Sequence, residues 1–232
     1  MDFYRFESGA HDVVRVEYDP GRSAHIALIK RREGSKSVPV DIGAKLAESD
    51  ERDRKARDEV KGGWSYILAP DGLRAGDVVV SYRTGIPKGI VEGWDDIVPV
   101  IDDPSAPQTV NEPNGVSSRA LGLLRTHTLR PGNVLPLYLI PPGTIIHNLS
   151  LEPNGRMQLC RSAGVSAQIV AHQGAEGEAL GGTAVLGMGG RHVGKNGIRT
   201  TKSRGIVLVK LRSGEVRRMQ PGAVATIGLV SK

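Results

Sequence analysis

The sequence predicts an all-β protein built from small barrels, and two observations carry this prediction. The 232 residues include 30 Gly and 14 Pro, which interrupt regular structure, whereas aromatic residues make up only 4%. Apolar and polar residues alternate in short runs that end at turn sequences. We therefore expect short strands joined by turns rather than long helices.

The first unit is expected to span residues 1–133. A hairpin is predicted where residues 13–18 and 23–30 flank the turn Asp19-Pro20-Gly21-Arg22, because Pro fixes φ and Gly tolerates a positive φ. Two more strands are expected at residues 64–69 and 77–81, on either side of a Pro-Asp-Gly turn. Short strands in this arrangement suit an oligonucleotide-binding-type (OB-fold) five-stranded barrel.

The second unit is expected to span residues 134–232. Five short strands, separated by glycines, predict an SH3-like barrel with a tight hairpin at Arg212-Ser213-Gly214-Glu215. These strands are expected at residues 144–151, 166–172, 205–211, 215–219 and 225–230.

Three insertions interrupt the two predicted barrels. In residues 31–63, opposite charges recur three and four positions apart between 44 and 61, which indicates an exposed helix or loop, with contact to another protein as the alternative. Residues 85–130 begin acidic and Pro-rich, which favours a loop that faces proteins rather than RNA. The third insertion, residues 174–204, is rich in Gly and basic residues.

Composition and charge restrict the class of protein. The single cysteine, Cys160, excludes an intrachain disulfide framework and fits a reducing compartment. No apolar run is long enough to span a bilayer and the N-terminus does not resemble a signal peptide, so we expect a soluble chain. Residues 1–130 carry a net charge of −2 and residues 131–232 a net charge of +8, so a polyanionic partner is expected at the second half.

The basic insertion contains a near match to a phosphate-binding loop, because Gly189 is followed after four residues by Gly194-Lys195. That motif requires Ser or Thr next, to hold Mg²⁺, and Asn196 stands there instead. A glycine-rich basic loop that approaches RNA phosphates is the favoured interpretation, and a plain surface loop is the alternative. The RNA-contact candidates in this segment are Arg191, Lys195, Arg199, Lys202 and Arg204.

No pattern typical of catalysis or metal binding stands out. His25, His147 and His172 fall within predicted strands, where a structural histidine is expected, and the six His with one Cys show no zinc-ligand spacing. The sequence has no nucleophile elbow, and its carboxylates gather in the insertions rather than in a dry pocket. The sequence therefore predicts no enzyme, metal site or cofactor, although structural Mg²⁺ or K⁺ bridging to RNA remains compatible with it.

Several long motifs resemble, in the same order, the family of the universal ribosomal protein numbered two of the large subunit. They are the run from Glu17 to Leu28, the run from Tyr66 to Leu73, the central run from Pro131 to Gln168 with Arg161-Ser162-Ala163-Gly164, and the run from Arg212 to Arg218 with Ala225-Thr226-Ile227-Gly228. The resemblance covers both predicted barrels and leaves out the insertions.

The resemblance implies an OB-fold barrel, an SH3-like barrel and binding to large-subunit rRNA near the peptidyl-transferase region and the subunit interface. The resemblance also implies that neighbouring ribosomal proteins contact the insertions and that contact with the small subunit is possible. It implies no membrane partner. The large insertions are similar to those of mitochondrial, particularly fungal, members, which implies the mitochondrial matrix, with a plastid or bacterial ribosome as the alternative. The RNA contacts that it implies are Arg22, Ser23, Arg161, Ser162, Ala163, Gly164, Ser166, Gln168, Arg212, Arg217 and Arg218.

The family's basic N-terminal arm and its His- and Gly-rich C-terminal extension have no counterpart in this sequence. We therefore expect no histidine here to take over the role proposed for that extension in peptide-bond formation. Two other functions stay open: a nucleotide hydrolase that uses Gly189 to Lys195, and an RNA-binding translation factor that visits the ribosome.

Overall fold

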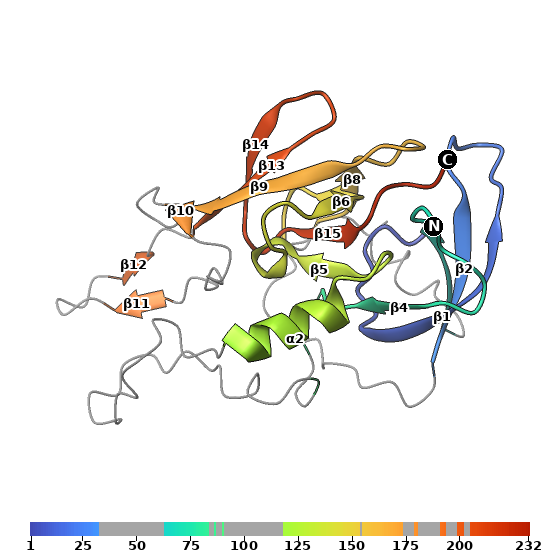
Figure 1. The fold of residues 1–232 in the computed structure, drawn as a ribbon, viewed down its shortest axis with the longest axis horizontal. Coiled ribbons are helices and arrows are strands. Elements are labelled where there is room, and N and C mark those ends of the chain that lie inside the picture. The colour runs from blue at the N-terminus through green and yellow to red at the C-terminus, as the bar shows by residue number, and fades with distance from the viewer. Residues whose placement is uncertain are drawn as a thin grey trace.

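The computed structural model describes residues 1–32, 63–83, 86, 90, 118–153, 155–173, 179–180, 191–193, 199–201 and 205–232. These residues form fifteen strands and one α-helix, so the predicted all-β class is confirmed. Figure 1 shows the strands from the N-terminal part on one side and those from the C-terminal part on the other. The predicted helix or loop at residues 44–61 lies outside the described residues.

The first β unit is an antiparallel sheet in the order β4-β1-β2-β3. Its register shifts between Val13 and Arg15, so the alternation of buried and exposed residues along β1 stops after Val13. The turn that starts at Asp19 is closed by two hydrogen bonds, from Arg22 N to Asp19 O (3.0 Å) and from Gly21 N to Asp19 Oδ1 (2.9 Å). The unit comprises β1 (Gly9–Glu17), β2 (Ile26–Arg31), β3 (Trp64–Leu68) and β4 (Val78–Ser81).

The second β unit continues the same sheet in the order β5-β15-β6-β9-β13-β14. The predicted hairpin is confirmed, since Gly214 has a φ of 89° and its N–H donates to Leu211 O (2.9 Å). The members of this unit are β5 (Val134–Pro136), β6 (Ile145–His147), β9 (Ala167–Gln173), β13 (Ile206–Lys210), β14 (Val216–Met219) and β15 (Val224–Ile227).

The strand expected at residues 144–151 is broken. Asn148 has a φ of 48°, a left-handed conformation that Asn tolerates better than most residues, and it separates β6 from β7 (Leu149–Ser150). β7 pairs with β8 (Met157–Leu159), which, like β5, was not predicted. His25 precedes β2, so its predicted place within a strand is wrong, whereas His147 and His172 lie in strands and are buried.

The described parts of the insertions also contain regular structure. α2 (Ser118–Thr128) precedes β5, at the end of a segment for which the sequence predicts only a loop. β10 (Ala179–Leu180) pairs with β9, and β11 (Arg191–Val193) pairs with β12 (Arg199–Thr201). A 3-10 turn, η2 (Leu137–Leu139), follows β5. None of the helices in the described residues is long and apolar enough to cross a membrane.

Each unit has its own apolar core. Val13, Ile29, Ile67 and Val79 form the core of the first unit, and none of them is more than 2% exposed. A larger cluster fills the second unit, including Leu135, Leu137, Ile146, Ile169, Val207, Val209 and Ile227. Two separate cores agree with two folding units, and the boundary at residue 133 remains a prediction.

Strand pairing and hydrogen bonds hold the two units against each other. β4 and β5 pair in parallel at Ser81 and Val134, and the buried Asn133 accepts from Val80 N through its Oδ1 (2.8 Å). The C-terminal segment crosses back to the first unit, where Ser231 N donates to Ala69 O (3.0 Å) and Ser231 Oγ accepts from His25 N (3.1 Å). The surfaces at the junction are therefore held in a defined relative position.

The side chain of the buried Arg83 adds further hydrogen bonds at this junction. Its guanidinium donates to the backbone carbonyls of Tyr4, Pro153 and Gly155, and it lies 4.3 Å from the centroid of the Phe6 ring. One side chain of the first unit thereby holds both the N-terminal segment and the loop before β8.

Candidate nucleic-acid interface

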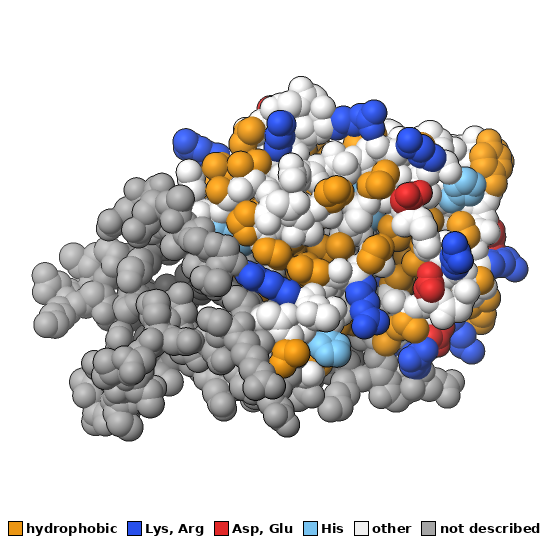
Figure 2. All heavy atoms as spheres, viewed as in Figure 1, with side chains coloured by type: hydrophobic (Ala, Val, Ile, Leu, Met, Phe, Trp, Pro, Cys, Tyr) orange, Lys and Arg blue, Asp and Glu red, His pale blue; other side chains and the backbone are white. Residues whose placement is uncertain are grey.

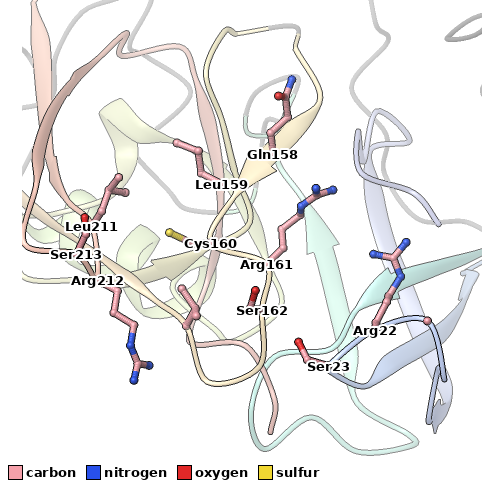
Figure 3. A pocket seen from close by; sticks show the side chains of 12 residues that line it. Arg22, Ser23, Gln158, Leu159, Cys160, Arg161, Ser162, Leu211, Arg212 and Ser213 are labelled. Carbon is pink, nitrogen blue, oxygen red and sulfur yellow. The ribbon is translucent and has the colours of Figure 1, made fainter.

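A cleft of about 560 Å³ opens where the two units meet. Three segments line it: the tip of the β1–β2 hairpin, β8 with the residues that follow it, and the turn between β13 and β14. Five residues for which the sequence predicts RNA contact lie on its walls, namely Arg22, Ser23, Arg161, Ser162 and Arg212 (Figure 3). The fold thus brings together candidates that are far apart in the sequence.

Hydrogen bonds hold the loop beside the cleft in place, and the first of them crosses the junction between the units. Ala163 N donates to Ser23 Oγ (3.1 Å), and Gly164 N donates to Val230 O (3.1 Å). Arg212 Nη1 donates to Gly164 O (2.5 Å), which ties the β13–β14 turn to the same loop. Ser23, Ala163 and Gly164 therefore have structural roles in addition to any contact with RNA.

Gly164 has a left-handed backbone conformation that favours glycine. Its φ is 63°, and a Cβ placed there would lie 2.8 Å from Cε of Lys232, whose side chain covers it. The Arg-Ser-Ala-Gly sequence allows the loop to lie close to the C-terminal segment, as expected for small residues.

Two of the arginines face the same way. Figure 3 shows Arg22 and Arg161, from opposite walls, extending to the same side of the cleft, whereas Arg212 points in the other direction. The guanidinium carbons of Arg22 and Arg161 lie 5.2 and 4.7 Å from the centroid of the buried Phe3 ring. Arg156, at 4.8 Å from that centroid, joins them and was not predicted from the sequence.

The cleft carries an excess of positive charge. Arg22 forms an ion pair with Asp19 (Nε to Oδ2, 3.0 Å), and no ion pair joins Arg156 or Arg161 to a carboxylate among the residues that the structure describes. Burial, followed by the charges of Arg156 and Arg22, lowers the pKa of Arg161 below its ordinary value. Arginine still keeps its proton at neutral pH, so the site is cationic. Burial also raises the pKa of the Cys160 thiol, which favours its neutral form.

The remaining predicted contacts do not join this cluster. Ser166 is partly buried, and the exposed Gln168 donates to Gly143 O (3.1 Å). Arg217 and Arg218 are exposed on β14, where consecutive side chains point to opposite faces of the strand. Arg217 pairs with Glu215 (2.8 Å). On the face seen in Figure 2, Lys and Arg side chains are spread widely and Asp and Glu are few.

The basic insertion, residues 174–204, is described only in part. Arg191 and Arg199 lie on β11 and β12, while Lys195, Lys202 and Arg204 lie outside the described residues. β11 occupies the middle of the near match to a phosphate-binding loop and pairs with β12. A backbone engaged in strand pairing does not present its N–H groups as a phosphate cradle, and the hydrolase alternative is not favoured.

The buried histidines act as structural residues. Burial lowers the pKa of His147 to about 4, although its hydrogen bond to Gly228 O (2.8 Å) acts in the opposite direction. Burial also lowers the pKa of His11 to about 4, with Arg5 as the next cause. Among the described residues, His, Cys, Asp and Glu nowhere gather in groups of three that could hold a metal ion.

A cationic cleft on a chain whose excess of basic residues lies in its second half is the electrostatic pattern expected of a nucleic-acid-binding protein. Comparison with known families agrees: residues 1–46 match the RNA-binding N-terminal domain of ribosomal proteins L2, and residues 130–232 match the C-terminal domain of ribosomal proteins L2. The chain belongs to the ribosomal protein L2 family, whose domains are OB-fold and SH3-like barrels.

Individual relatives match along the whole chain. The chain is 36% identical over 231 residues to the large ribosomal subunit protein uL2m of Neurospora crassa and 33% identical over 231 residues to that of Schizosaccharomyces pombe. It is 29% identical over 232 residues to the large ribosomal subunit protein uL2 of Granulibacter bethesdensis. All of this chain is covered, and it spans 43%, 45% and 48% of these three relatives.

Proposed function

We propose that this protein is a structural component of the large subunit of a mitochondrial ribosome and that it binds large-subunit rRNA. Membership in the L2 family and the two fungal relatives, which are named as mitochondrial large-subunit proteins, support the assignment. The mitochondrial matrix is the corresponding location, and the role is architectural rather than catalytic.

The observation that carries the proposal is the cleft at the junction, where Arg22 of the first unit and Arg161 of the second face the same side. Guanidinium groups bind phosphate oxygens through two N–H donors at once. RNA that crosses the junction would therefore contact both units. Because phosphates look alike along a strand, this mode of binding recognises RNA shape more than base sequence.

The proposal extends to the position within the ribosome. We place the protein near the peptidyl-transferase region and the subunit interface, with neighbouring ribosomal proteins contacting its insertions and the small subunit close by. The division into an OB-fold barrel over residues 1–133 and an SH3-like barrel over residues 134–232 belongs to this proposal. Arg191, Arg199, Lys195, Lys202 and Arg204 would add phosphate contacts from the basic insertion, and Arg217 and Arg218 from β14.

The test is rRNA affinity measured over a range of KCl concentrations for the full chain. Charge removal at Arg161, Arg217 and Arg218 should weaken binding and reduce the slope of log K against log[salt] by about 1 for each lost phosphate contact. Arg74→Gln is the control, because Arg74 is an exposed arginine outside the cleft. Unchanged affinity of the triple variant at every salt concentration would count against the proposal.

A further inference from the structure

Three arginine side chains share one aromatic ring at the junction. The guanidinium carbons of Arg22, Arg156 and Arg161 lie 5.2, 4.8 and 4.7 Å from the centroid of the Phe3 ring. They come from three segments: the β1–β2 turn, the residue before β8 and the loop after β8. Because each carbon lies within 5.2 Å of the same centroid, no two of them can be further apart than twice that distance.

Phe3 is fixed in position by both units. The N–H of its neighbour Asp2 donates to Tyr66 O (2.7 Å) in β3, and Phe3 O accepts from Met157 N (3.0 Å) in β8. The side chain is only 2% exposed. The ring therefore stays where the three guanidinium groups meet and cannot turn away into solvent.

The charges in this cluster are not balanced. Asp19, which pairs with Arg22, is the only carboxylate joined to any of the three arginines in the described part of the chain. The negative face of an aromatic ring attracts cations and so offsets part of the repulsion among them. The Phe3 ring carries no net charge, so the three arginines with Asp19 keep an excess of positive charge.

This arrangement leaves donor groups available for an anion. A guanidinium group can lie over an aromatic ring and still direct N–H groups outward in its own plane, which an ammonium group cannot do in the same way. Figure 3 shows Arg22 and Arg161 reaching to the same side of the cleft. Arg156 and Arg161 lie over the same ring, and burial, together with the repulsion of Arg161 by Arg156 and Arg22, lowers the pKa of Arg161. A phosphodiester group placed among them would relieve that repulsion and accept hydrogen bonds from more than one arginine.

We propose that Phe3 is a positioning residue that holds Arg22, Arg156 and Arg161 as a single binding site for a phosphodiester group of the RNA backbone, with Arg156 as its third arginine. That this phosphate belongs to rRNA rests on the function proposed above. The contribution of Phe3 acts through the arginines, since the buried ring does not itself contact RNA.

The experiment uses the full chain and transcribed large-subunit rRNA, with dissociation constants measured between about 0.05 and 0.3 M KCl, a range over which the screening of charges changes strongly. Arg156→Gln should weaken binding about tenfold and reduce the salt slope by about 1. Arg74→Gln, which removes the same charge from an exposed arginine outside the cleft, should leave the slope near that of the unaltered chain.

Phe3→Leu and the double variant Phe3→Leu/Arg156→Gln complete the test. Phe3→Leu keeps an apolar side chain and removes the ring face, so it should weaken rRNA binding by itself and have a much smaller effect when Arg156 is already Gln. Thermal unfolding of each variant shows which of them remain folded. A Phe3 that only supports the fold would lower affinity by the same factor with or without Arg156.

The experiment distinguishes failure of the proposed function from failure of the present inference. An unaltered chain that does not bind rRNA would refute the proposed function. If the unaltered chain binds rRNA and Arg156→Gln keeps both its affinity and its salt slope, or the effects of Phe3→Leu and Arg156→Gln multiply, the present inference is overturned and the proposed function stands.

Discussion

Gly132 is the position where a single methyl group should most directly disturb the junction between the two units. Its φ is 90°, and its N–H donates to Ile227 O (3.0 Å) in the second unit. A Cβ added to it would lie 2.6 Å from Cγ1 of Val79 and 3.4 Å from Cγ of Pro70, both of which are buried in the first unit. Gly132→Ala therefore combines backbone strain with a collision between the segment that enters β5 and two buried side chains of the first unit.

The two costs can be separated with Gly76, which has the same φ of 90° and no atom within 4 Å of the position that an added methyl group would take. An L-residue in this backbone region costs about 1–2 kcal/mol, which applies to both substitutions. Overpacking against the fully buried Val79 adds about 1–3 kcal/mol at Gly132 alone. The loss of conformational freedom in the unfolded chain is the same for both changes and cancels in the comparison.

The assay is urea unfolding of Gly132→Ala and Gly76→Ala next to the unaltered chain, with the free energy of unfolding obtained from the midpoint and slope. We expect Gly76→Ala to lower it by about 1–2 kcal/mol and Gly132→Ala by about 2–5 kcal/mol. Equal losses for the two variants would refute the close approach of Gly132 to Val79. A Gly132→Ala chain that cannot be obtained folded, while Gly76→Ala folds, would agree with it.

Two further predictions concern buried polar side chains. Arg83→Met should lower the free energy of unfolding by about 3 kcal/mol, because three partly buried backbone carbonyls lose a charged donor, while Arg74→Met at an exposed position should have little effect. Stability should also fall as the pH drops from 6.5 to 4, by about 1.4 kcal/mol per pH unit for each of His11 and His147. The pKa of each is lowered to about 4, so in this range the unfolded chain binds protons that the folded chain does not. Urea unfolding at about pH 7, 6 and 5 measures this dependence, and a constant free energy would contradict it.

Much of the fold could be predicted because local residue patterns determine it. The Asp-Pro-Gly turn and the Arg-Ser-Gly-Glu hairpin contain residues that suit their backbone angles, and each lies where the sequence predicts. β5 and β8 were missed because strands of three residues are too short to show a period of two. The break at Asn148 depends on a left-handed backbone that the sequence permits without requiring it.

Part of the candidate site could also be predicted, but from the family resemblance rather than from local residue patterns. Arg22 and Arg161 stand in motifs that carry the family resemblance, so the sequence identifies them. Arg156 lies within the central run but is not singled out by the motif, and Phe3 lies outside the motifs. The importance of both comes from contacts between segments that are distant in the chain. A second arginine shortly before Arg161 was the one signal available. Conversely, Arg212 resembles the others in sequence, but the fold directs it away from Arg22 and Arg161 (Figure 3).

The most direct test of the central claim is sedimentation of the endogenous protein through a high-salt sucrose gradient, with RNA crosslinks mapped in the fraction that contains it. We expect it to remain with the large ribosomal subunit and to crosslink to rRNA through peptides that contain Arg22 and Arg161. An integral component keeps its place at salt concentrations that remove visiting factors, because its interface is large and many contacts would have to break together. Recovery at the top of the gradient, free of rRNA, would contradict the assignment.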